Sequence, residues 1–197
     1  IGHKAIARVL SDIAAMGGKP EWALIDLVAP EKMSVSAMDA IYSGAMKTAG
    51  KYGLAIVGGD TSSGPALELH VFAIGTVPCG QAVLRSGAKP GDLIFVTGFL
   101  GGSYSGKHLR FTPRLKEGSF LRKWATSMID VSDGLASDLM HLTTRSNTGA
   151  MLVLDSIPLS ASSSKLKGKL SPVEHALYDG EAFELLFTIP RHKLHSF

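Results

Sequence analysis

The chain has 197 residues, enough for one large domain or two small ones, and 45% hydrophobic residues supply a sizeable core. Its formal net charge is only +3 and the basic side chains are scattered, which argues against a nucleic-acid-binding protein. No apolar run is long enough to cross a membrane, no export leader is apparent, and the single cysteine, Cys79, allows no internal disulfide. We therefore expect a cytoplasmic globular protein without a membrane or nucleic-acid partner.

Helical periodicity and stop signals predict the first elements. Apolar residues recur at three-to-four spacing over residues 2–16, and two glycines follow, so a helix is expected there. Alternation predicts a strand over residues 22–28. A capping-box spacing at Ser36 predicts a helix that ends near Tyr52.

Two side chains on these helices have simple structural interpretations. Asp12 lies beside Arg8 on the first helix, so a solvent-facing ion pair is the simplest role for it. Tyr42 lies on the second helix, where a tyrosine at helical spacing is most often a core residue.

A glycine-rich acidic segment, residues 58–65, follows the next predicted strand, residues 54–57. Asp60 is expected where this strand passes into a loop, with Gly58 and Gly59 before it and hydroxyl side chains after it. Glycines allow the backbone to approach a ligand closely, and oxygen ligands suit a hard cation. A polar turn explains the same residues equally well.

A second unit is predicted after a long strand at residues 67–77. Gly, Pro and small polar residues gather at residues 85–92, and a buried strand restarts at residues 93–96. We therefore expect an N-terminal domain over residues 1–84, a linker over residues 85–92, and a C-terminal domain over residues 93–197.

Residues 101–107 have the glycine and lysine spacing of a phosphate-binding P-loop. His108 follows where that loop needs a serine or threonine to hold magnesium, so we reject this interpretation. Residues 110–122 are basic and predicted to form a surface loop.

A second acidic group joins a strand at residues 128–131 to a helix at residues 135–144. Asp130 and Asp133 flank Ser132 at this junction, where free N–H groups at the helix start favour phosphate oxygens. Capping by Ser132 or Asp133 explains one acid but not both.

Two further strands are expected at residues 150–154 and 183–189. Glu181 and Glu184 lie near the start of the second strand, where glutamates are usually solvated.

Five segments in order resemble the thiamine-monophosphate kinases, within the ATP-binding superfamily that includes aminoimidazole ribonucleotide synthetase and selenophosphate synthetase. The segments span nearly the whole chain: residues 1–17, 57–61, 85–88, 129–135 and 179–188. The resemblance implies an α/β (α+β) fold with two domains, in which the N-terminal sheet pairs across a homodimer and a C-terminal α/β domain completes the cleft. It implies ATP-dependent phosphorylation of thiamine monophosphate.

The resemblance also implies roles for individual residues, replacing the bland interpretations of Asp12 and Tyr42. Four aspartates would bind Mg²⁺: Asp12, Asp60, Asp130 and Asp133. ATP would contact a second group, Tyr42, Gly59, Asp60, Arg85 and Ser132, while Glu181 would contact the thiamine phosphate. No side chain is expected to act as a general base.

The chain departs from the family pattern in three places. We expect it to lack the acidic segment that precedes the first helix in the family, and the family's C-terminal end. The last motif has Asp179 in place of a glycine and Ala182 in place of an aspartate. A sister ATP-dependent synthetase and a non-catalytic nucleotide-binding dimer therefore stand as alternatives.

Overall fold

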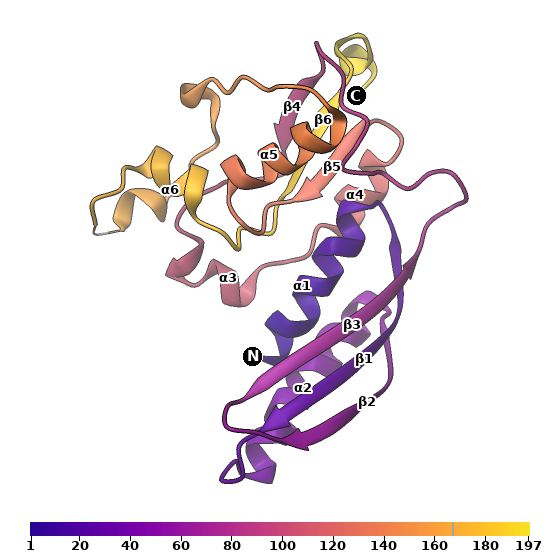
Figure 1. The fold of residues 1–197 in the computed structure, drawn as a ribbon, viewed down its shortest axis with the longest axis vertical. Helices are drawn as coiled ribbons and strands as arrows, with labels where there is room; N and C mark the ends of the chain where they lie inside the picture. The colour runs from indigo at the N-terminus through magenta and orange to yellow at the C-terminus, as the bar shows by residue number, and fades with distance from the viewer. Residues whose placement is uncertain (167) are drawn as a thin grey trace.

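The computed structural model describes residues 1–166 and 168–197, which form two three-stranded sheets with helices packed against them (Figure 1). The first sheet has the order β2-β1-β3, with β2 parallel and β3 antiparallel to the central strand. Its elements are α1 (Gly2–Ala15), β1 (Lys19–Ala29), α2 (Val35–Tyr52), β2 (Ala55–Ser63) and β3 (Glu68–Thr76).

The two faces of the first sheet differ in how far their apolar side chains are buried. Alternate residues of β1, such as Ala23 and Ile25, are buried against Ile6 and Leu10 of α1 and Ala45 of α2. The opposite face exposes large apolar side chains, namely Trp22, Leu24, Val57, Phe72 and Ile74. One face of the sheet is therefore a core and the other is an uncovered apolar surface.

The second sheet has the order β4-β6-β5, and both pairings are antiparallel. All five residues of β6 are buried, as expected for a central strand covered on both faces. The strands and α-helices of this half are β4 (Leu93–Val96), α3 (Lys107–Arg110), α4 (Leu115–Leu121), β5 (Ser127–Asp130), α5 (Leu135–Ser146), α6 (Pro172–Tyr178) and β6 (Leu185–Ile189). Short 3₁₀ turns lie at Ser103–Ser105, Leu154–Ser156, Ser163–Lys165 and Arg191–Ser196.

Helix α1 packs against both halves of the chain. Its Ile6 and Leu10 belong to the core of the first sheet, whereas Ala14 and Ala15 pack with Met128 and other residues of the second. In Figure 1, α1 lies alongside β3 and its C-terminal end approaches α4 and β5. The domain boundary at residues 85–92 stays a prediction.

The structure corrects several predicted elements. Strand β2 continues through Asp60 to Ser63 because residues 58–63 pair with β1, so the acid lies within a strand rather than at a strand-to-loop transition. The cap of α2 is Ser34, whose side chain accepts the N–H of Ala37, and not Ser36.

Two segments of the second half were also assigned wrongly. Residues 150–153 form no strand, because they pair with no neighbouring strand. Residues 110–122 include helix α4, and Phe111 and Leu121 are buried rather than part of a surface loop. Within the described part of the chain, no helix combines the length and hydropathy that crossing a membrane requires.

Candidate active site

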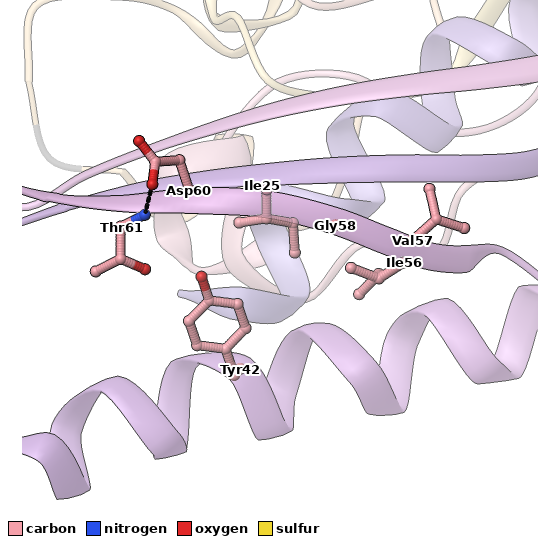
Figure 2. Close-up of a pocket in the computed structure, with 8 residues that line it drawn as sticks. Ile25, Tyr42, Ile56, Val57, Gly58, Asp60 and Thr61 are labelled. Carbon is pink, nitrogen blue, oxygen red and sulfur yellow. Dashed lines mark hydrogen bonds between the residues drawn. The ribbon is translucent and has the colours of Figure 1, made fainter.

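Asp60 lies on β2 opposite Asp26 of β1, beside a pocket of about 500 Å³. The pocket is also lined by Tyr42 and Gly59, so three of the predicted ATP-site residues share it. Figure 2 shows the Tyr42 ring rising from α2 toward β2, with the Asp60 carboxylate on the other side of the strand. An oxygen of this carboxylate accepts the N–H of Thr61 at 2.8 Å, which fixes its orientation.

Gly59 is required by the backbone at this point. Its φ of +152° is rarely adopted by other residues, and a Cβ at this position would overlap the backbone of Ile25. The glycine before the acid therefore permits close β1–β2 pairing.

A second pocket, of about 200 Å³, brings together Asp12, Arg85 and Asp130. Asp130 is the last residue of β5 and is 3% exposed. The Ser11 hydroxyl donates a hydrogen bond of 2.7 Å to its Oδ2. Burial raises the pKa of Asp130 to about 6, opposed by the Ser11 hydrogen bond and reinforced by the negative charge of Asp12.

The pKa of Asp12 is raised as well. Partial burial raises its pKa, while the positive charges of Arg85 and Arg8 oppose that shift. The ion pairs found within the described residues do not include an Asp12–Arg8 pair, so the simple surface pairing considered from the sequence is absent.

The junction between β5 and α5 differs from a simple helix cap. Gly134 is the N-cap residue of α5, and neither Ser132 nor Asp133 caps it through its side chain. Instead, the backbone N–H of Asp133 donates to Asp138 Oδ2 at 3.0 Å. Burial raises the pKa of Asp138 to about 6. Asp138 is not among the site residues predicted from the sequence, where its only signal is an acid in the first turn of a predicted helix.

Glu181 lies next to the same junction. Its backbone N–H donates to the Ser132 carbonyl at 2.7 Å, and its own φ is +60°. The Glu181 carboxylate forms an ion pair with Lys4 of α1 at 2.7 Å. The structure thus connects the predicted substrate residue both to Ser132 and to α1.

Glu184 is buried, contrary to the expectation of a solvated residue. It is 2% exposed, and its carboxylate is bound by Arg114 at 2.8 Å and by Lys107 at 2.7 Å. Burial favours the neutral acid, but these cations outweigh it, so the pKa of Glu184 lies below its ordinary value. Lys107, the lysine of the P-loop-like spacing, is committed to this pair, in agreement with the rejection of a P-loop.

The predicted metal ligands are distributed over separate places. Asp12 and Asp130 share one pocket, Asp60 lines another, and Asp133 lies exposed at the α5 junction. Within residues 1–166 and 168–197, no three His, Cys, Asp or Glu side chains converge as a metal-binding group. The Asp12–Asp130 pair still suits Mg²⁺ chemically, because its oxygens are hard ligands and its mutual repulsion is relieved by a cation.

Comparison with known proteins identifies the family. The family model for the N-terminal domain of AIR synthase related proteins matches residues 1–77. A thiamine-monophosphate kinase of Aquifex aeolicus is 35% identical over 223 residues, which cover all of this chain and 71% of the relative. The chain belongs to the thiamine-monophosphate kinase family.

Other members of the thiamine-monophosphate kinase family agree in sequence and in structure. The Rhodopirellula baltica enzyme is 42% identical over 195 residues, and the match covers 96% of this chain. The solved structure of AaThiL complexed with AMPPCP and TMP superposes with a TM-score of 0.90 at 34% identity, covering 98% of this chain and 69% of that one. These matches confirm the predicted α/β fold of the family. The chain spans 61% of the length of the Rhodopirellula baltica relative.

Proposed function

We propose that the protein transfers the γ-phosphoryl group of ATP to thiamine monophosphate, giving thiamine diphosphate. The family membership supplies the reaction class, since relatives are named for this activity. The observation that carries the proposal is Asp130, a buried carboxylate beside Asp12 whose charge is only partly compensated. Such a pair is suited to a divalent cation that accompanies a polyphosphate.

The residue roles in this proposal divide between the two pockets. Asp12 and Asp130 hold Mg²⁺ in one pocket, while Asp60 and Asp133 supply further oxygen ligands from β2 and the α5 junction. Bound Mg²⁺ would supply charge neutralisation between the two polyanionic substrates. A third group positions the ATP: Tyr42, Gly59, Arg85 and Ser132.

The acceptor end of the site requires little proton chemistry. A phosphate monoester has a second pKa near 6, so the acceptor is largely dianionic at pH 7 and needs no general base. Arg85, which lines the Asp12–Asp130 pocket, stabilises negative charge that develops on the transferred group. Glu181 holds the organic part of the acceptor, close to Ser132.

We propose that the protein forms a homodimer through the uncovered apolar face of the first sheet. Phe72, Val57 and Trp22 are 62%, 61% and 50% exposed on three adjacent strands, an apolar surface of the kind that mediates association. A cytoplasmic location, expected from the single cysteine, stays a prediction.

The test measures formation of ADP and thiamine diphosphate by the intact protein, using ³¹P NMR with ATP, Mg²⁺ and thiamine monophosphate. Stoichiometric appearance of both products supports the kinase. ADP formation only with an amide or carbonyl acceptor would indicate a sister synthetase. ATP binding in calorimetry without turnover on any acceptor would indicate a non-catalytic nucleotide-binding dimer.

A further inference from the structure

A charged groove lies between the N-terminal half of α1 and the start of β3. Its volume is about 570 Å³, and it is lined by Lys4, Arg8 and Asp12 together with Leu67 and His70. The three α1 residues are spaced by four, so they lie on one face of the helix. Figure 1 shows this part of α1 running alongside β3.

Two cationic side chains of the groove, Lys4 and Arg8, lie between two acidic ones, Glu181 and Asp12. Lys4 is bound to Glu181 at one end, and Asp12 lies at the other end. Arg8 stands between them and is exposed. Arg8 lines the groove, and it takes part in none of the side-chain hydrogen bonds and ion pairs of the described residues.

We propose that Lys4 and Arg8 form the subsite for the phosphate of the acceptor substrate, and that Lys4 exchanges the Glu181 carboxylate for this phosphate when the substrate binds. The inference rests on the proposed function and deepens it. It assigns a subsite to two residues for which sequence motifs indicated no ligand role.

Charge complementarity supports this assignment. Thiamine monophosphate carries a cationic ring and an anionic phosphate, so one ligand replaces both partners of the Lys4–Glu181 ion pair. A guanidinium offers forked donors that match phosphate oxygens, and an ammonium adds a compact charge. When the ion pair separates, the phosphate becomes the partner of Lys4 and the cationic ring becomes the partner of Glu181, so neither charge is left unpaired.

The position along α1 also fits the reaction. Lys4 and Asp12 are eight residues apart, about 12 Å along a helix. Arg8 lies midway, so a phosphate bound there sits one helical turn from the carboxylate proposed to hold Mg²⁺. The subsite therefore delivers the acceptor phosphate toward the Asp12–Asp130 pocket and leaves the ring near Glu181.

The decisive variant is Arg8→Gln in the intact protein. We expect KM for thiamine monophosphate to rise about 10- to 100-fold, with KM for ATP unchanged and kcat within about twofold, because a charge-assisted contact to bound substrate is lost. Arg145→Gln, an exposed arginine at the end of α5, is the matched control and should leave all constants unchanged. An unaltered KM for thiamine monophosphate in Arg8→Gln would overturn the subsite while leaving the kinase proposal intact.

Calorimetry without ATP separates the subsite from the activity. The wild-type protein should bind thiamine monophosphate more tightly than unphosphorylated thiamine, and Arg8→Gln should lose most of this preference. Lys4→Gln should weaken thiamine monophosphate but not thiamine, since it removes the phosphate partner and frees Glu181. Equal weakening of both ligands would show a purely structural role and overturn the proposal. Preserved discrimination in a protein without turnover would sustain the subsite and reject the kinase.

Discussion

Two buried carboxylates at the ends of neighbouring strands have opposite electrostatic environments. Glu184 immediately precedes β6 and Asp130 ends β5, and they are 2% and 3% exposed. Glu184 accepts bonds from two cationic side chains and from the Thr97 hydroxyl. Among the described side chains, only the Ser11 hydroxyl donates to Asp130.

This difference distinguishes a structural acid from a candidate ligand. The cations around Glu184 lower its pKa, whereas burial and nearby acids raise that of Asp130 to about 6. A buried charge that the fold leaves undercompensated is costly, and such groups concentrate at functional sites. We therefore propose that Glu184 serves stability and Asp130 serves function, and four experiments test that division.

The largest expected effect is on turnover in Asp130→Asn. Loss of a proposed metal ligand should lower kcat roughly a thousandfold, equivalent to about 4 kcal/mol of transition-state stabilisation. In Mg²⁺-free buffer at pH 7 the same variant should be more stable than wild type by about 3 kcal/mol, because it removes an acid with a raised pKa. Steady-state kinetics and urea unfolding measure the two effects. Exposed Asp155→Asn is the control, and unchanged turnover in Asp130→Asn would contradict the functional assignment.

Glu184→Gln should lower the stability of the protein rather than its turnover. It leaves Arg114 and Lys107 without their buried partner and should lower the free energy of unfolding by about 3 kcal/mol, at the low end for buried pairs because both cations are about one third exposed. Urea denaturation measures this change. Glu117→Gln breaks only the partly exposed pair with Arg114 and should cost less than about 1 kcal/mol. Equal effects of the two variants would show that the buried network is not the source of stability.

The pH dependence of stability should separate the two acids in Mg²⁺-free protein. The lowered pKa of Glu184 contributes stability above its ordinary value of 4.5, and this contribution is lost as pH falls below that value. The raised pKa of Asp130 acts oppositely, so stability falls as pH rises from 3.8 to about 6. Asp138 contributes in the same window. Unfolding is followed from pH 3 to 8. In Glu184→Gln the free energy of unfolding should no longer fall as the pH drops below 4.5. In Asp130→Asn it should fall less as the pH rises toward 6. Identical pH profiles for both variants would remove the basis of the comparison.

The smallest effect is stabilisation by Mg²⁺. At ten times its dissociation constant, the ion should raise the free energy of unfolding at pH 7 by about 1.4 kcal/mol. The increase should disappear in Asp130→Asn and persist in Glu117→Gln, as followed by thermal unfolding. Retention of the full increase in Asp130→Asn would place the ion elsewhere.

Local sequence was sufficient to predict many elements and to identify the acids. The helix expected at residues 2–16 is α1, and the strand expected at residues 93–96 is β4, because periodicity and glycine stops are local signals. The motifs around Asp60 and Asp130 also indicated the family, which the comparisons confirm. Helix α6, not predicted here, has a local signal as well: Ser171 and Glu174 form a capping box around Pro172.

Tertiary structure alone decided the environments of these acids. Asp130 receives its hydrogen bond from Ser11, 119 positions earlier, and Glu184 is bound by Arg114 and Lys107, 70 and 77 positions away. The extension of β2 through Asp60 likewise depends on pairing with β1. Sequence determined which residue types were available, whereas burial and long-range partners determined which carboxylate has its charge compensated by cations and which does not.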